Sequence, residues 1–243
     1  LRTSEGNERC QEVDQLISSA PLSWLVTQLQ PSLPAAALEA ARALRYRDFL
    51  TVALILRTPS SFPDNWLYIH DPNLQVGRIQ NFGNWSPEML ADPAMACYGM
   101  EYFCDSREAL WKSSDSALIA MATRELLSLG LAQEGDVIDG AVVRQSRAYP
   151  VYDDAYTERR NTIRAALNDH CPGLHVMGRN GMHQYNNQDH SMMTAMLTVR
   201  NILAGEQLYA VWQVNQDAEY IEAGPSGSNT ASAADPTSAD RGA

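Results

Sequence analysis

The residue types best suited to chemistry gather near the C-terminus, between Gly178 and Ser191. This segment reads Gly-Arg-Asn-Gly-Met-His-Gln-Tyr-Asn-Asn-Gln-Asp-His-Ser and leads into an apolar stretch predicted to be helical from about Gln188 to Leu203. One Ser or Asp satisfies the N–H groups at a helix start that most need a partner, so the segment holds more polar groups than capping requires. The helix dipole favours an electron-rich ligand there, and glycines permit its close approach to the backbone. The alternative is a surface helix with an unusually polar cap.

A second candidate is the stretch 77–85, which includes Arg78 and Trp85. It mixes an arginine, amides and aromatic rings, which suits the wall of a substrate site, and arginine binds phosphate through a planar fork of donors. A stable strand and turn explains the same residues. Arg78 is expected to pair across strands with Glu101, chiefly as a structural ion pair.

Composition excludes several classes of protein. The net charge of −11 opposes binding to a phosphate backbone, so nucleic-acid binding is not expected. No apolar run has the length of about 18–20 residues that spans a bilayer, so no transmembrane segment is expected. The 4 cysteines show no metal-finger spacing, no metal site is predicted, and with no signal peptide visible a reducing cytoplasm is expected. Lys112 is the only lysine, which argues against Schiff-base chemistry and simple amine oxidation.

The elements that must position these residues follow from periodicity and from Gly and Pro breaks. Strands are predicted at 13–18, 49–57, 66–70, 76–82, 96–103, 142–149 and 174–177, and helices at 22–29, 34–44, 115–129, 157–167 and 188–203. This order predicts an α+β fold. We expect a mostly antiparallel sheet from 49–103 and 142–149, flanked by the helices at 34–44 and 115–129. A strand–loop–helix unit is expected to follow near the C-terminus.

The order of residues between Gly178 and Ser191 resembles the C-terminal flavin-binding segment of one superfamily. Gly-Arg is followed by a tyrosine six places after the arginine, and then by Asn-Gln-Asp-His-Ser opening an apolar helix. The pattern is similar to that of the FAD-dependent amine oxidase, protoporphyrinogen oxidase and phytoene desaturase superfamily, which includes UDP-galactopyranose mutase. One difference is the single residue between Tyr185 and Asn187, where the family has a slightly longer spacer. Residues 13–21 and 147–152 resemble the segments that leave and re-enter the family's flavin domain.

The resemblance implies a division of the chain. Residues 13–20 and 151–222 would be an α/β remnant of the FAD-binding domain, and residues 21–150 would be a substrate-binding domain. Residues 1–12 are expected to be a flexible start and 223–243 a disordered tail, because the latter has no bulky apolar side chain. The Gly-x-Gly-x-x-Gly motif is absent, so the implied partner is the N-terminal dinucleotide-binding half of a longer protein. This chain alone is expected to hold FAD weakly or not at all.

The resemblance also implies roles for individual residues. Cofactor-binding positions would be Gly178, Arg179, Asn180, Gly181, Asn187, Gln188, Asp189, His190 and Ser191; substrate-binding positions would be Arg78, Trp85, Tyr149 and Tyr185. Tyr149 and Tyr185 resemble positions that hold a sugar-nucleotide diphosphate in the mutase, where phenol hydroxyls can donate to phosphate oxygens without a buried charge; two half-buried structural tyrosines are the alternative. Simple capping remains an alternative for Asp189 and Ser191, and no catalytic residue is identified. The implied function is hydride transfer between a small organic substrate and flavin N5. Two alternatives are a mutase-like isomerase acting on a nucleotide sugar, and a fragment without activity of its own.

Overall fold

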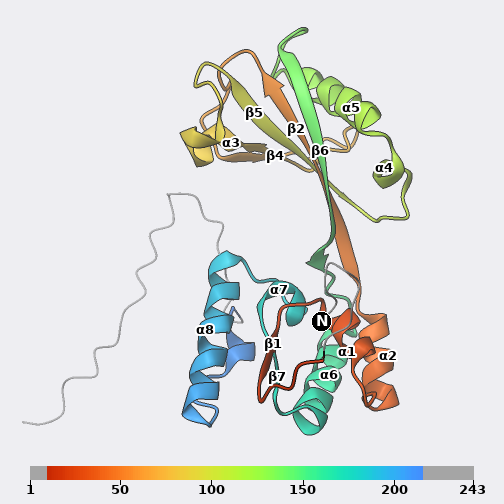
Figure 1. Ribbon diagram of the computed structural model, residues 1–243. Helices are drawn as coiled ribbons and strands as arrows, with labels where there is room; N and C mark the ends of the chain where they lie inside the picture. Colours follow the sequence, from red (N-terminus) through yellow and green to blue (C-terminus); the bar gives the residue numbers. More distant parts are fainter. Residues whose placement is uncertain (1–9, 216–243) are drawn as a thin grey trace, which may run out of the picture.

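The computed structural model describes residues 10–215, and it has two lobes joined by two long strands (Figure 1). Residues 1–9 of the predicted flexible start, and all of the predicted tail 223–243, lie outside the described residues. The sheet lobe consists of residues 46–150. The helical lobe consists of residues 16–44 and 151–213, which come together from the two ends of the described chain.

The sheet lobe is built on five antiparallel strands in the order β3-β4-β5-β2-β6. Their bounds are Tyr46–Leu56 for β2, Trp66–Tyr68 for β3, Arg78–Asn81 for β4, Ala96–Cys104 for β5 and Val137–Pro150 for β6. Side chains alternate between the two faces of a strand, so one face collects Leu50, Val52 and Leu54 into a buried core. Helix α5 (Asp115–Ser128) covers this face with Leu118 and Leu126, and Ser114 caps its start. The α+β fold with an antiparallel sheet is therefore confirmed.

The opposite face of the sheet carries the candidate polar residues. Arg78 and Gln80 on β4 lie on this face, as does Glu101 on β5, because each alternates with a core residue. The short helix α3 (Phe82–Trp85) covers part of it, and its Phe82 ring lies against Gly99. Three further short elements lie at the lobe's edges and beyond: η1 (Pro87–Met89), α4 (Ala109–Lys112) and, in the helical lobe, η2 (Val211–Gln213).

The helical lobe has its own core, separate from that of the sheet lobe. Strand β1 (Leu16–Ser18) pairs in parallel with β7 (Leu174–Val176). Helices α1 (Leu22–Gln28), α2 (Ala35–Ala43) and α6 (Tyr156–His170) pack beside them. The prediction that the helix at 34–44 flanks the sheet is wrong. Its small buried residues Ala37, Ala40 and Ala41 let it pack closely on neighbouring helices, so residues 22–44 share a core with α6 and β7.

The C-terminal unit follows β7 and contains one feature that periodicity did not predict. Residues expected to form a loop make a single helical turn, α7 (Gly178–Gly181), before α8 (Gln188–Ala204) begins. In α8 only Thr194 and Thr198 are buried. Its exposed apolar side chains are Met192, Met193, Met196, Val199 and Leu203. No helix in residues 10–215 has the length and apolar character needed to cross a membrane.

Candidate functional site

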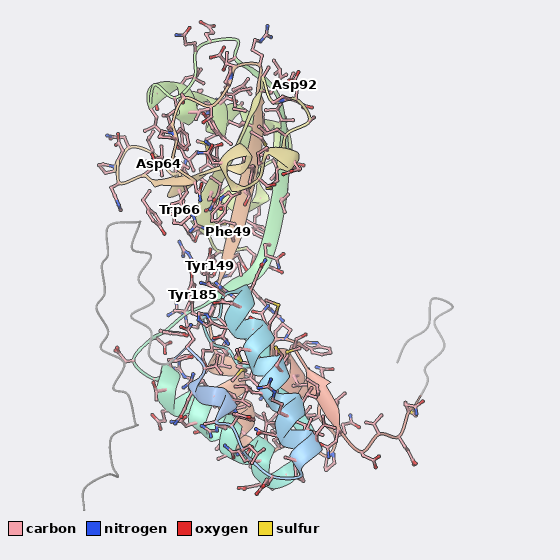
Figure 2. All side chains as sticks on the ribbon, turned by 90° about the vertical axis from the view of Figure 1, so that its left-hand side faces the viewer. Phe49, Asp64, Trp66, Asp92, Tyr149 and Tyr185 are labelled. Atoms are coloured by element: carbon pink, nitrogen blue, oxygen red, sulfur yellow. The ribbon has the colours of Figure 1, made fainter. Side chains whose placement is uncertain are left out.

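The two lobes meet where β2 begins and β6 ends, and Tyr149 lies at this junction (Figure 2). The β2–β6 pairing shifts register between Arg47 and Phe49, which turns the end of β6 toward the helical lobe. The Tyr149 ring packs edge-on against Phe49, with ring centroids 5.7 Å apart. It also contacts Phe103 in a tilted arrangement, with centroids 5.6 Å apart. Tyr149 is therefore held on the open face of the sheet, opposite α5.

Tyr185 reaches the same place from the helical lobe. It lies in the loop between α7 and α8, and its ring stacks beside Tyr149 with a centroid separation of 5.9 Å and an interplanar angle of 18°. Figure 2 shows both side chains together at the junction. Tyr185 keeps 39% of its surface exposed. The two predicted tyrosines therefore share one accessible side of the fold, although 36 residues of sequence numbering, from 149 to 185, separate them.

Arg179 joins the two tyrosines. Its guanidinium carbon lies 4.5 Å from the ring centroid of Tyr149 and 4.3 Å from that of Tyr185. Its Nε donates a hydrogen bond to the Ala148 carbonyl at 2.7 Å, and Nη1 donates to the Asn186 carbonyl at 3.4 Å. Within residues 10–215 no carboxylate pairs with Arg179. A fixed positive charge without a counter-charge and two phenols therefore converge, a combination that suits an anion.

Arg78 is close to this group but is committed to Glu101. The two residues are directly opposite on β4 and β5, and their ion pair is buried, with side chains 16% and 7% exposed. Burial lowers the pKa of Arg78, but the Glu101 carboxylate outweighs burial and raises the pKa above its ordinary value. Burial also raises the pKa of Tyr149, and the positive charge of Arg78 partly opposes this. The expected cross-strand ion pair is confirmed, and Arg78 acts on the site as a nearby charge.

Trp85 lies elsewhere on the same face. It stacks on Trp66 with centroids 5.3 Å apart, and its Nε1 donates to the Gln80 side chain at 2.8 Å. Gln80 is two residues along β4 from Arg78, so Trp85 is on the same side of the sheet. No ring contact joins Trp85 to Tyr149 or Tyr185 among the described residues.

The remaining candidate residues surround the start of α8. Asn187 and His190 form a capping box, in which each side chain accepts from the other residue's backbone N–H. Capping therefore accounts for these two residues, whereas the capping alternative named Asp189 and Ser191. Gln188 and Asp189 are exposed at the helix start, and Ser191 is half-buried. The N–H of Gly178, a residue with φ of +74°, donates to Thr194 Oγ1 at 2.9 Å.

Buried polar atoms near α7 test whether the segment fits a flavin. The Asn180 Oδ1 and both side-chain polar atoms of Asn186 are buried with no hydrogen-bond partner in residues 10–215. Asn180 also lines a polar cavity of about 580 Å³ at the junction, together with Tyr46 and Arg147. Asn186 is sealed from solvent, so only the Asn180 amide is placed to meet a ligand in this cavity. An amide beside a helix start suits the polar edge of a flavin ring, which has both donors and acceptors. Asn180 therefore fits the cofactor that the sequence implies.

Two buried residues of the segment were not predicted as site residues. His183 and Asn186 are both sealed from solvent, and neither ring nitrogen of His183 has a partner in the described part of the chain. Burial, with a further contribution from Arg160, lowers the pKa of His183 to about 4. The sequence could not predict that these two residues are buried, because they lie in a segment, Gly178 to Ser191, in which most residues are polar. Residues 10–215 contain no group of three or more His, Cys, Asp or Glu side chains able to hold a metal ion.

An antiparallel sheet lobe, joined by long strands to a parallel strand pair and a strand–turn–helix unit with this polar segment, is also found in two solved structures. Reduced UDP-galactopyranose mutase is similar with a TM-score of 0.71 and 19% identity, over 85% of this chain and 44% of that chain. A protein assigned as protoporphyrinogen oxidase, from Exiguobacterium sp. 255-15, is similar with a TM-score of 0.60 and 16% identity, over 79% of this chain and 42% of that chain.

The expected resemblance is therefore confirmed at the level of the fold. The chain spans less than half the length of these two solved structures. No protein-family model matches the chain, and no curated protein does.

Proposed function

We propose that this chain is the substrate-binding and C-terminal part of a flavin-dependent enzyme. The single observation that carries the proposal is the convergence of Tyr149, Tyr185 and Arg179 beside the segment that opens α8. The α7 turn and the start of α8 would face the flavin, with Asn180 and Gln188 toward its polar edge. FAD, when bound, supplies at N5 either a hydride acceptor or a nucleophile.

The substrate of such an enzyme would carry a phosphate or diphosphate. Two tyrosine rings meet a guanidinium at one place, and phenol and guanidinium groups are donors that phosphate oxygens accept; Arg78 adds a second positive charge nearby. Arg179, expected from the resemblance to line the flavin, would then also contact the substrate. A nucleotide sugar is the substrate class that we favour.

Two reactions remain as candidates. The tyrosine pair supports a nucleotide-sugar isomerase of the UDP-galactopyranose mutase type, because the anion-binding group serves no purpose for an uncharged substrate. Hydride transfer from an organic substrate to flavin N5 is the second candidate, supported by the fold shared with a protein assigned as an oxidase. In either case these side chains would bind and orient the substrate, which lowers the entropic part of the barrier.

The rest of the protein would complete the helical lobe. Two-stranded parallel sheets are rarely left uncovered, because parallel strands are normally buried on both faces. Here Leu16 and Ile17 of β1 are exposed, as is the apolar side of α8. A helix that is apolar on most sides is normally buried in the core of a larger protein. We propose that the N-terminal dinucleotide-binding half of a longer protein covers these surfaces and supplies the phosphate-binding part of the FAD site.

Binding of UDP to the chain tests the substrate site. Tyr185→Phe should weaken UDP binding by about 0.5–3 kcal/mol, the range for one hydrogen bond to a neutral or charged partner. Tyr209→Phe is the matched control, because no hydrogen bond to its hydroxyl is recorded in residues 10–215. Isothermal titration calorimetry measures both. Equal UDP affinity in wild type and Tyr185→Phe would contradict the anion site.

Incubation of the longer protein with UDP-galactopyranose separates the two reactions. An isomerase should convert the sugar only when the flavin is reduced, and with no net change in flavin redox state. An oxidoreductase should instead bleach the oxidised flavin stoichiometrically with its substrate. Chromatography of the sugar product, with the flavin spectrum recorded in parallel, gives both readings.

A further inference from the structure

We infer that three side chains are positioning residues that fix Tyr185 in the anion site: Tyr152, which precedes α6, and Tyr156 and Arg160 on α6. They are here called the α6 ladder. The inference rests on the proposed function, because it concerns the same site. Within residues 10–215, no hydrogen bond or ring contact joins any of the three to Tyr149 or to the Arg179 guanidinium. They act instead on the loop that carries Tyr185.

Tyr152 holds the peptide that precedes Tyr185. The N–H of Tyr185 donates to the Tyr152 hydroxyl at 2.6 Å. The Tyr152 ring stacks on Tyr156, with centroids 4.0 Å apart and an interplanar angle of 23°, so the hydroxyl that accepts this hydrogen bond cannot swing away freely.

Tyr156 and Arg160 hold the two residues before Tyr185. The hydroxyl of Tyr156 donates to the His183 carbonyl at 2.8 Å. One turn further along α6, Arg160 Nη1 donates to the Gln184 side chain at 3.1 Å and to the Tyr156 hydroxyl at 3.2 Å. Residues four apart lie on one face of a helix, so Tyr156 and Arg160 present their groups to the loop together.

The segment that follows α8 holds the other side of Tyr185. Asn215 Nδ2 donates to the Tyr185 carbonyl at 2.5 Å, and the Gln184 side chain donates to the Val214 carbonyl at 2.7 Å. The N–H and the carbonyl of Tyr185 belong to the two peptide planes on either side of its Cα. Because each peptide unit is planar, fixing both planes fixes the direction of the Cα–Cβ bond. The ring of Tyr185 is thereby aimed at Arg179 and Tyr149.

These hydrogen bonds favour a positioning role because packing alone does not hold the Tyr185 side chain in place. Its ring is partly exposed, and its recorded ring contacts are with Tyr149 and Arg179. An exposed ring normally samples several orientations, and each one lost on binding would weaken ligand affinity. Side chains from two distant segments restrict this loop residue before any ligand arrives.

Tyr152→Phe and a substitution that removes the Asn215 amide, Asn215→Gly, test the inference in the chain as it stands. The first keeps the ring stack and removes only the hydroxyl; the second uses glycine because it accepts the φ of +63° at this position, removes the N–H donor and adds no charge near an anionic ligand. Each should weaken binding of UDP, the probe used, by about 3- to 10-fold, the range for one lost hydrogen bond. Each should also accelerate amide hydrogen exchange near Tyr185, with Tyr152→Phe acting directly on the Tyr185 N–H. Tyr209→Phe should change neither quantity.

The outcomes separate the inference from the function on which it rests. Faster exchange together with weaker UDP binding supports positioning. Faster exchange with UDP affinity within twofold of wild type overturns it, as does unchanged exchange at Tyr185. Failure of the wild-type chain to bind UDP would instead remove the proposed function. In that case amide hydrogen exchange alone would test whether the α6 ladder holds Tyr185. Unchanged exchange in the variants would again overturn the inference.

Discussion

At the scale of single residues, Arg78 and Glu101 form a buried ion pair between β4 and β5. Their ion pair lies on the open face of the sheet but is shielded from water. Two charges removed from water lose solvation, and their mutual attraction only partly restores it. A buried pair of this kind is therefore sensitive to loss of either partner.

We expect Arg78→Met to destabilise the fold by about 3–5 kcal/mol, because it leaves the Glu101 carboxylate buried without a partner. The double variant Arg78→Met, Glu101→Met should recover most of that loss, because it removes both charges. Urea unfolding followed by circular dichroism measures each variant. Additive effects of the two substitutions would show that the residues do not interact.

His183 predicts a pH dependence of stability. Its pKa in the folded protein is lowered to about 4 by burial, below the ordinary value of 6.5, so the folded state prefers the neutral ring. Between these two values the unfolded chain binds more protons than the folded chain, and stability must fall as the pH is lowered from 6.5 to 4. The full contribution, present above pH 6.5, is on the order of 3 kcal/mol.

His183→Gln should flatten this part of the stability profile, even if it lowers stability at every pH. Urea titrations at several pH values between 4 and 7 give the slope. An equal slope in wild type and His183→Gln would assign the dependence to other groups.

At the scale of elements, the approach of α7 to the end of β1 depends on one glycine. A Cβ atom on Gly181 would lie 2.8 Å from the Ser18 carbonyl oxygen and 3.2 Å from the Ser19 Cα. Both obstacles are backbone atoms, which cannot move without displacing the strand. The short turn that carries Arg179 is therefore held against the parallel strand pair.

Gly181→Ala should consequently destabilise the chain by about 1–3 kcal/mol, the usual range for overpacking. Gly83→Ala is the control. Its Cβ would meet only the flexible tip of Leu90, at 2.7 Å, which can rotate away. Thermal unfolding compares the two variants. A smaller loss for Gly181→Ala than for Gly83→Ala would mean that α7 can shift from β1 at little cost.

At the scale of the whole molecule, we expect a substitution on the exposed apolar side of α8 to have little effect in this chain and a large effect in a longer protein. Leu203 is 81% exposed here, so Leu203→Glu should change the stability of the chain by no more than about 0.5 kcal/mol. In a longer protein with its dinucleotide-binding half, the same substitution should bury an unpaired charge and lower flavin content. Flavin absorbance per protein measures this, and unchanged flavin content would indicate that α8 stays exposed.

The chain by itself should not bind FAD tightly, because it lacks the glycine-rich turn that cradles the pyrophosphate. Equilibrium dialysis of the purified chain against FAD measures this directly. A yellow protein with a flavin spectrum near one-to-one stoichiometry would show that the α8 start and the junction hold the cofactor without that turn.

The sequence by itself determined most of the longer elements and the type of sheet, but not the single turn α7. The alternation of apolar residues in 49–57 and the helical spacing in 115–129 are local signals, since each depends on neighbours a few residues away. The same reasoning located the start of α8 and the polar segment before it. The order of residues in that segment also led to the expected resemblance, which is confirmed at the level of the fold.

Only the tertiary structure decided which of these elements meet. The placement of α2 against α6, and of Arg179 between Tyr149 and Tyr185, depends on contacts between segments far apart in the chain. Periodicity reports which face of an element is apolar, but not which partner covers it. Burial of His183 and Asn186, and the support that the α6 ladder gives Tyr185, likewise arise only when β2 and β6 bring the two lobes together.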